Sequence, residues 1–398
     1  MPKQVSHDMA VSYTRDEYSR QQFVTGMRRY VLGDLAGHMR TSYEANVKPA
    51  LERKNGHAPK DGREIHTAMK SDPMFKFYST VRGATQEMVW RSVMPGIERE
   101  AEDLAERAAQ HNNGSGNADG TLDINPKFKT PRYISALDVH LMPGCYHTEY
   151  FDGDVSQGAL YENGLNVFLM GFLGPECDDT GRAVAHFLKE RYPDFKPKKM
   201  LDIGATIGFH SHPWLEVWPD LEIHAIDVGA PNVRYGHARS QALGETIHWH
   251  LMDGADLKFE DETFDIVWSA MVLHEMPMKV VSKVFEESRR VLKPNGLMLH
   301  MELPLNKYVE PYEQFYIDWD SYYNKEPFYK SLRDLDVDKA MADAGFEADK
   351  LVQFVVPSLH NNGEEALLSA ARANAAGVEG NVGKLQGGLK WFTFGAWK

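Results

Sequence analysis

The chain has few cysteines and no long apolar run. Two cysteines, Cys145 and Cys177, occur among 398 residues, so a disulfide framework is excluded and a reducing compartment is indicated. No apolar run approaches the roughly 18 residues of a membrane span. The N-terminal stretch M-P-K-Q-V-S-H-D lacks the apolar core of a signal peptide. The sequence therefore predicts a soluble cytoplasmic protein with no membrane partner.

The chain also lacks an excess of basic residues. It carries 44 lysines and arginines against 57 aspartates and glutamates, which gives a formal net charge of −13. A protein that binds nucleic acid normally needs a basic face, so no nucleic-acid partner is expected. The length is sufficient for two or three domains of roughly 150 residues each.

The most informative stretch that is present is residues 199–208, K-M-L-D-I-G-A-T-I-G. Its first half is apolar and typical of a buried strand, and Gly204 and Gly208 bracket a tight loop before an expected helix. Such a loop lets the backbone approach a bound nucleotide-like ligand. A second apolar run, residues 222–227, ends at Asp227, about twenty residues past the loop, where an acid can take both hydroxyls of a ribose.

Strand and helix patterns alternate through the second half of the chain. Strands are expected near Met200, Ile223, 247–252, 264–269, 297–302, 351–356 and 391–395. Helices are expected between them, including 280–292 and 337–344. Alternation of this kind predicts a parallel sheet with helices on both faces.

These motifs together resemble the class I S-adenosylmethionine-dependent methyltransferases. After L-D-I-G-A-T-I-G and Asp227 come M-D-G-A-D-L-K-F at 252–259, F-D-I-V-W-S at 264–269, L-H-E-M-P at 273–277 and R-V-L-K-P-N-G at 290–296. Several motifs in register are more specific than one, and they cover roughly the second half of the chain. The resemblance implies a Rossmann-like, seven-stranded, mostly parallel sheet with helices on both faces. It also implies S-adenosylmethionine as the cofactor and methyl transfer as the activity.

The resemblance assigns cofactor roles to individual residues. Asp202 supports the loop; Gly204, Ala205, Thr206 and Gly208 line the methionine and ribose; Asp227 takes the ribose hydroxyls; Asp253 accepts from the adenine amine, with Gly254 and Ala255 beside the ring; Val228 and Ser269 complete the set. One position departs from the family pattern, because the middle glycine of its loop is Thr206 here. A side chain there could clash with the cofactor or hydrogen-bond to it.

His274 is the candidate general base. It follows the fourth strand, and V-L-H-E resembles the V-L-H-D stretch of the caffeic-acid-type O-methyltransferases, in which that histidine deprotonates a hydroxyl. The tryptophan that usually follows there is Met276 here. An imidazole with a pKa of about 6.5 suits a phenol or an enol. The alternative is a histidine that only shapes the pocket. Glu302, at the end of the fifth strand, is the candidate to orient the imidazole, and the adjacent Glu275 is not expected to do so.

The first 130 residues favour a helical N-terminal domain. Apolar residues recur at helical spacing through 14–111, and their apolar faces must be buried against something. We therefore expect these helices to cover the site or to form the interface of a homodimer. Residues 112–120, N-N-G-S-G-N-A-D-G, are turn-rich and predict a flexible loop or linker. Residues 131–195 are then the connecting segment and lid, and 196–398 the cofactor-binding domain.

The lid candidates are Tyr146, His147 and Tyr150, which follow a Pro-Gly turn and could face the methyl donor or acceptor. The alternative for them is aromatic packing between domains. His140 and His147 match no known metal spacing, so no metal site is predicted.

Two inserts, at 306–330 and 360–390, extend the cofactor-binding domain. The first is rich in aromatic residues, and its Tyr316 and Trp319 are candidates for the wall of an acceptor pocket. Packing against the N-terminal helices is the alternative for these rings. The role of the second insert is not readable from its composition.

The resulting functional prediction is methyl transfer to a small organic acceptor. The stretch S-A-M-V-L at 269–273 does not resemble the N-P-P-Y-type motif of enzymes that methylate nucleic-acid amines, and the acidic charge agrees with this. Oxygen is the first choice for the accepting atom, followed by carbon, nitrogen or sulfur. The alternative is a protein that binds S-adenosylmethionine as a sensor or scaffold without catalysis.

Overall fold

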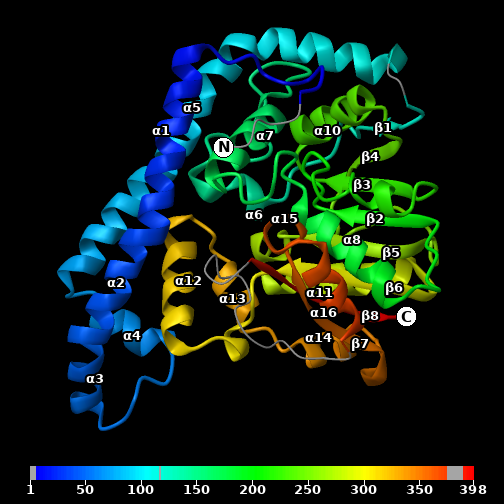
Figure 1. Ribbon diagram of the computed structural model, residues 1–398. Helices are drawn as coiled ribbons and strands as arrows, with labels where there is room; N and C mark the ends of the chain where they lie inside the picture. Colours follow the sequence, from blue (N-terminus) through cyan, green and yellow to red (C-terminus); the bar gives the residue numbers. More distant parts are fainter. Residues whose placement is uncertain (1–5, 116–117, 374–388) are drawn as a thin grey trace.

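A single eight-stranded sheet forms the centre of the computed structural model, which describes residues 6–115, 118–373 and 389–398 (Figure 1). The strands are β1 (Leu122–Asp123), β2 (Lys199–Ile203), β3 (Glu222–Asp227), β4 (Ile247–Leu251), β5 (Phe264–Ala270), β6 (Leu292–Glu302), β7 (Leu351–Pro357) and β8 (Lys390–Trp397). Their order across the sheet is β1-β4-β3-β2-β5-β6-β8-β7. Only β8 runs antiparallel to its neighbours, β6 and β7, among the described strands.

The expected Rossmann-like sheet is therefore confirmed, and β2 to β8 coincide with the seven expected strands. The eighth strand, β1, comes from the segment before the cofactor motifs. It has two residues, which pair in parallel with Trp249 and His250 of β4 at one edge of the sheet. So short a strand carries no readable alternation, and the sequence therefore did not reveal it.

Helices cover both faces of the sheet because successive strand residues point to opposite sides. Met200 packs in one core with α7 (Ser156–Phe168), α8 (Asp179–Arg191), α10 (Ala230–Leu243) and α16 (Glu364–Arg372). Leu201 packs in the other core with α11 (Met278–Val291), α13 (Tyr329–Arg333) and α14 (Val337–Asp343). The remaining short helices of this half are α6 (Arg132–Ser135), α9 (Trp214–Val217) and α15 (Leu359–Asn362).

The sequence predicted a helix directly after the glycine loop, and the structure does not have it there. Residues 206–213 form successive turns, and the helix that follows, α9, has four residues. Pro213 explains this, because a proline disfavours helical backbone at the preceding residue and lacks an N–H group of its own. The loop is braced instead by Ser211, whose hydroxyl donates to Asp202 Oδ2 at 2.6 Å.

The N-terminal helices form a separate layer beside the sheet (Figure 1). They are α1 (Arg15–Tyr30), α2 (Ala36–Ser42), α3 (Lys48–Asn55), α4 (Gly62–Met69) and α5 (Pro73–Gln110), so the expected helical stretch is confirmed. A capping box starts α1, in which Thr14 and Glu17 satisfy each other's backbone N–H groups. Asp72 and Pro73 start α5 in the same region. Among the described helices, none is both long and apolar enough to cross a membrane.

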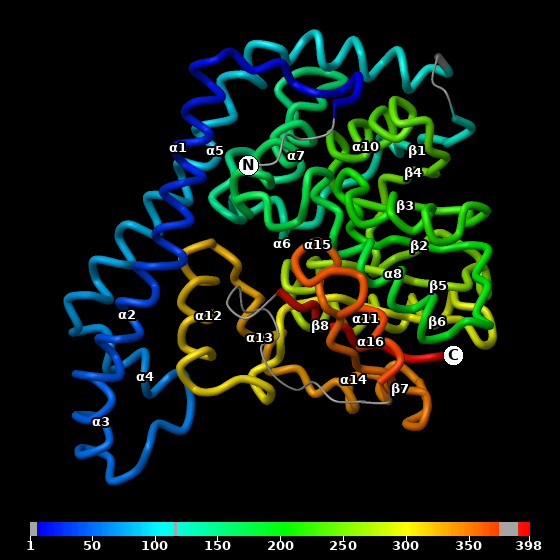
Figure 2. Tube along the Cα trace, viewed as in Figure 1, coloured from blue at the N-terminus to red at the C-terminus, as the bar shows by residue number. Residues whose placement is uncertain are grey.

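The helix α12 (Pro311–Tyr323) lies beside this N-terminal layer rather than over the sheet (Figures 1 and 2). Its buried rings join a hydrophobic cluster with α2, α4 and α5. Trp319 Nε1–H donates to Ser79 Oγ at 3.0 Å, and the hydroxyls of Tyr316 and Tyr78 lie 2.8 Å apart. The candidate role of Tyr316 and Trp319 as an acceptor pocket wall is therefore corrected, and the packing alternative holds for both.

The segment 112–120 is fastened to the sheet layer in its described part. Asn112 Nδ2 donates to the carbonyl of Arg234, and its Oδ1 lies 2.7 Å from His237 Nδ1, both on α10. Of the second insert, residues 374–388 lie outside the described residues, and the part before them forms α15 and α16. The domain boundaries at 130 and 195 stay a prediction.

Candidate active site

A cavity lies where the strand order reverses, at the carboxyl ends of β2 and β5. The space inside it, open mouth included, is about 600 Å³. It is lined by Tyr133, Ile134, Tyr146, Tyr161, Ile203, Gly204, Thr206, Ile226, Asp227, Val228, Met252, Gly254, Ala270, Met271, Val272, Glu275 and Met276. This position is the crevice at which open α/β sheets bind their ligands.

The glycine loop forms one wall of the cavity. Gly204 has a φ of 71°, and a Cβ placed on it would lie 2.3 Å from Val272 Cγ2, so only glycine fits. Thr206 has a φ of 54° and also lies in the left-handed region, which a β-branched residue rarely adopts. Its backbone N–H donates to Asp227 Oδ2 at 3.0 Å. The loop and the carboxylate are thus held together.

Asp227 is the acidic group of this wall. It is 7% exposed, and its Oδ1 accepts from the N–H of Gly229 at 2.8 Å. Burial raises the pKa of Asp227 to about 6, and the backbone hydrogen bonds oppose this only in part. Each carboxylate oxygen can accept more than one hydrogen bond, so both retain capacity for a ligand's hydroxyls. The residues present therefore fit a ribose at this point.

The other predicted cofactor residues divide into two groups. Val228 and Gly254 line the cavity with Gly204, Thr206 and Asp227, whereas Asp202, Ala205, Gly208, Asp253, Ala255 and Ser269 do not. Asp202 supports the turns after the loop through Ser211, and Asp253 Oδ1 accepts from the N–H of Ala255 at 2.9 Å. Ser269 is a correction, because it is fully buried with its hydroxyl 2.7 Å from His300 Nδ1.

His274 lies behind the cavity wall rather than in it. It is 2% exposed, and its ring stacks on Tyr329 with the centroids 4.2 Å apart. The expected orienting partner is present, since Glu302 Oε2 lies 2.7 Å from His274 Nδ1. Burial lowers the pKa of His274, but the charge and hydrogen bond of Glu302 outweigh it and raise the pKa to about 9. Glu302 thus favours the charged form of the ring, and the ring is not among the lining residues, so the role of proton acceptor that the sequence suggested stays a prediction.

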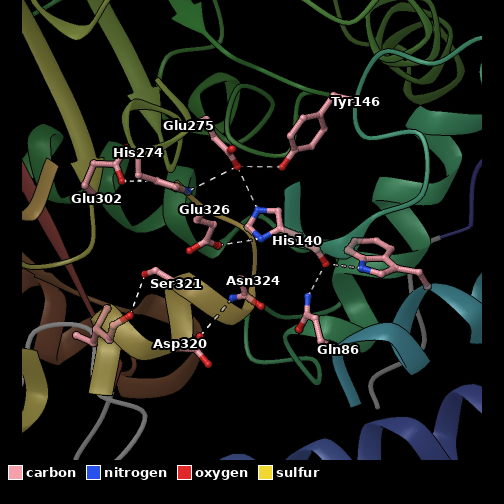
Figure 3. Close-up of polar contacts among 12 residues, drawn as sticks. Gln86, His140, Tyr146, His274, Glu275, Glu302, Asp320, Ser321, Asn324 and Glu326 are labelled. Carbon is pink, nitrogen blue, oxygen red and sulfur yellow. Dashed lines mark hydrogen bonds and ion pairs between the residues drawn. The ribbon is translucent and has the colours of Figure 1, made fainter. Parts of the chain in front are cut away.

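Glu275, and not His274, is the residue of this turn that lines the cavity. Figure 3 shows both side chains. Its Oε1 lies 3.8 Å from His274 Nε2 and 3.2 Å from His140 Nε2, and it accepts a hydrogen bond from Tyr146 Oη at 3.3 Å. Burial raises the pKa of Glu275, but the hydrogen bond and charge of His140 hold it below its usual value. Glu275 thus lies near His274 without a hydrogen bond to it, and Glu302 is the residue that orients the imidazole, as expected.

His140 and Glu326 complete this group of side chains (Figure 3). Glu326 Oε1 lies 2.9 Å from His140 Nδ1. Burial lowers the pKa of His140, but Glu275 and Glu326 together raise it to about 10. The sequence placed His140 in a segment dense in titratable residues but gave it no role, and Glu326 carried no sequence signal.

The lid candidates are only partly in the cavity. Tyr146 lines it, whereas His147 does not, and Tyr150 is 65% exposed on the surface. Tyr133, Ile134 and Tyr161 line the cavity from the same connecting segment, and the sequence did not single them out.

Comparisons with known proteins agree with this geometry. Residues 200–296 match the family described as "Methyltransferase domain", which confirms the resemblance read from the motifs. Malonyl-[acyl-carrier protein] O-methyltransferase of Herminiimonas arsenicoxydans is 30% identical over 166 residues, which are 41% of this chain and 58% of that protein. A ubiquinone/menaquinone biosynthesis C-methyltransferase of Cupriavidus metallidurans is 30% identical over 120 residues, which are 30% of this chain and 48% of that protein.

Two further similarities are to a named N-methyltransferase and to a solved structure. Phosphoethanolamine N-methyltransferase 2 of Caenorhabditis elegans is 27% identical over 135 residues, which are 33% of this chain and 29% of that protein. A SAM-dependent methyltransferase structure from Aquifex aeolicus is 20% identical, with a TM-score of 0.36, and covers 61% of this chain and 98% of that one. The chain spans less than two thirds of the length of the curated relatives that it matches.

Proposed function

We propose that this chain, which has an S-adenosylmethionine-dependent methyltransferase domain at residues 200–296, transfers a methyl group to an oxygen atom of a small organic acceptor. The observation that carries the proposal is one cavity that contains the glycine loop, Asp227 and Glu275 together. The first two suit the cofactor, and the third is a carboxylate at the far side where an acceptor would enter.

In the cofactor half of the cavity, different residues would contact different parts of S-adenosylmethionine. Asp227 would take the ribose hydroxyls, and the loop from Gly204 to Thr206 would contact the methionine portion. Gly254 lines the cavity and would lie beside the adenine, as the resemblance of its motif implies. S-adenosylmethionine supplies a methyl group that is already activated on its sulfonium sulfur. The protein mainly has to hold the acceptor in line with it.

The acceptor half is where Glu275 and Tyr146 work together. An ionised carboxylate accepts a hydrogen bond from an acceptor hydroxyl and takes its proton as the oxygen gains the methyl group. Tyr146, whose Oη is 3.3 Å from Glu275 Oε1, fixes the carboxylate and closes the cavity above it. Among the curated relatives described above, the longest match is to a named O-methyltransferase, which supports oxygen over the other atoms.

The test is product formation together with a cofactor-site variant. Purified protein is incubated with S-adenosylmethionine and pools of hydroxylated metabolites, and S-adenosylhomocysteine is measured. We expect turnover with the wild type and, at a cofactor concentration near the wild-type dissociation constant, much less with Asp227→Ala. Its dissociation constant for the cofactor should rise by roughly tenfold or more, because charge-assisted hydrogen bonds are lost.

The accepting atom is identified in the same reaction. A ¹³C-methyl donor marks the product, and the carbon chemical shift separates methyl groups on oxygen from those on nitrogen, sulfur or carbon. Label on another atom would replace the oxygen proposal. Tight cofactor binding without any S-adenosylhomocysteine would favour the sensor or scaffold alternative.

A further inference from the structure

Three metal-ligating side chains from distant parts of the sequence converge behind the cavity. They are His140 in the turn Val139–Leu141, His274 in the turn Leu273–Glu275, and Glu326 between α12 and α13. One ligand atom from each lies within 4.8 Å of those of the other two. Figure 3 shows the two imidazoles on either side of Glu275, with Glu326 next to His140.

The charges around this point are unbalanced and buried. Glu275, Glu302 and Glu326 are each below 8% exposed, and among the described residues only the two imidazoles form ion pairs with them. Three carboxylates therefore converge on two imidazoles, and each of these side chains can offer a ligand atom to a cation. Buried charge of this kind is costly unless it is paired or coordinates a metal.

Some of the close contacts within this cluster of histidines and glutamates do not have the geometry of a hydrogen bond. Glu326 Oε1 lies 2.9 Å from His140 Nδ1, yet this nitrogen has no hydrogen-bond partner of acceptable geometry among the described residues. Glu275 Oε2 is likewise buried without a partner in that part of the chain. Lone-pair donors that converge without a proton aligned between them are what a cation site presents before the ion binds.

Both imidazoles are held in place by outer contacts. Glu302 engages His274 at Nδ1 and also accepts from the backbone N–H of Leu273 at 2.7 Å, which leaves His274 Nε2 directed at the cluster. A carboxylate behind a ligating histidine is the usual second partner in metal sites. His140 is held in the left-handed region at a φ of 57°, while its carbonyl accepts from Gln86 Nε2 and Trp90 Nε1. Strained backbone that its neighbours fix in this way is typical of functional sites.

We propose that His140, His274 and Glu326 bind a divalent first-row transition-metal ion next to the cofactor cavity. Two imidazoles and one carboxylate are a donor set that zinc takes in sites with an open coordination position. Magnesium and calcium prefer oxygen ligands alone and are not expected here. The sequence predicted no metal because it compared spacings along the chain, whereas these ligands are separated by more than fifty residues in each case.

The ion would act on the cavity through Glu275. This side chain lines the cavity, and its Oε1 lies within 4 Å of the Nε2 atoms of both ligating histidines. The ion is therefore placed to fix the orientation of the one carboxylate that faces an acceptor. The metal site goes beyond the proposed methyl transfer, and metal binding can be measured whether or not turnover is found.

The experiment measures binding of Zn²⁺ to the full-length protein after chelation and dialysis, by titration calorimetry and elemental analysis. A second group, Glu222, His224 and His248, could bind zinc at the surface of β3 and β4, so the reference protein carries His224→Ala and His248→Ala. We expect the reference to bind one equivalent of Zn²⁺ and no Mg²⁺. Loading with Co²⁺ should give the visible absorption of a site of low coordination number.

Ligand variants in the reference background then locate the ion. Glu326→Gln and His140→Gln should each weaken Zn²⁺ binding at least a hundredfold, and Glu302→Gln should weaken it roughly tenfold to a hundredfold, as for a second partner of a ligating histidine. Circular dichroism and the dissociation constant for S-adenosylmethionine report whether each variant is folded. A reference protein that binds no Zn²⁺ overturns the proposal, as do folded ligand variants with unchanged affinity. The same two measurements are made on the reference protein, so the first outcome is read only from a folded chain.

Discussion

At the scale of single residues, Thr206 is the clearest departure from the methyltransferase loop pattern that residues 201–208 resemble. The loop requires a φ of 54° there, and a β-branched side chain pays about 1–3 kcal/mol for such a backbone. Thr206→Gly should therefore raise the free energy of unfolding by about 1 kcal/mol, after subtracting the extra chain entropy of glycine. Denaturant unfolding of both proteins measures this.

The matched control for that change is Thr67→Gly. Thr67 is exposed within α4, where φ is helical, so glycine should destabilise the protein there by a few tenths of a kcal/mol. If Thr206→Gly also destabilises, then the threonine hydroxyl, 3.4 Å from the carbonyl of Gly204, matters more than the strain.

Asp227 leads to a prediction about pH. Its pKa is raised to about 6, so the carboxylate keeps its proton until the pH exceeds that value. The ionised form is the one that accepts two hydrogen bonds from a ribose. The dissociation constant for S-adenosylmethionine should therefore be flat above about pH 7 and rise about tenfold for each unit below about pH 5.5, in calorimetry.

Asp227→Asn is the control for this profile. The amide cannot ionise, so the variant should bind more weakly but with the same affinity across that range. A wild-type affinity that does not change between pH 7 and pH 5 would remove Asp227 as the titrating group.

The sequence predicted that a change at His274 would lower turnover, and we now make this prediction for Glu275. Glu275 lines the cavity together with Asp227, the proposed ribose ligand, whereas His274 is not among the lining residues. Glu275→Gln should lower kcat by roughly a hundred- to ten-thousandfold and leave the dissociation constant for the cofactor nearly unchanged. Glu347→Gln, at an exposed position, is the control and should have no effect. A Glu275→Gln enzyme with most of its turnover would indicate an acceptor that gives up no proton.

The site residues show what could and could not be predicted at this scale. The motifs located Gly204, Asp227 and Gly254, because each follows a strand whose carboxyl end meets the same crevice. The motifs assigned Glu275 no place in the cavity, because the path of the chain after β5 cannot be read from periodicity. The chain enters a short 3-10 turn there, in which His274 and Glu275 are both buried.

At the scale of secondary-structure elements, strands were predicted better than the helices that carry no motif. The buried strands are continuous apolar runs, which are readable without knowing their neighbours. In α12 the same aromatic density fits a pocket wall or a packing face, and only the position of α2, α4 and α5 decides between them.

The role of α12 can be tested with two residues of the helix. Trp319 is fully buried against the N-terminal helices, so Trp319→Ala should lower the free energy of unfolding by about 3–5 kcal/mol. Tyr322 is 75% exposed on the same helix, and Tyr322→Ala should cost little. Denaturant unfolding gives both values. A Trp319→Ala protein with normal stability but a raised KM for its acceptor would instead support a role of Trp319 in the wall of the acceptor pocket.

At the scale of the whole molecule, the N-terminal helices and the sheet layer form one packed body. Trp90 of α5 packs against α7 so closely that a Cβ on Gly164 would lie 2.3 Å from its ring. Arg28 of α1 donates to the carbonyl of Phe168 and lies over its ring. The sequence predicted that these apolar helix faces must be covered, but not by what, because a hydrophobic face is non-directional.

Deletion of residues 1–110 tests this arrangement. It would remove α1 to α5 and expose the apolar faces of α7 and α12 together, along with the carbonyl of His140 that Gln86 and Trp90 now hold. We expect a truncated protein that aggregates and does not bind S-adenosylmethionine, because a large apolar patch and a loosened cavity wall arise at once.

Phe23→Ser, a change at a 64% exposed position of α1, should leave solubility and cofactor affinity as they are. The masses of the wild type and of the Phe23→Ser protein, measured by light scattering, also test the prediction of a homodimer. A truncated chain that stayed soluble, monomeric and active would show that the sheet layer folds without its N-terminal cover.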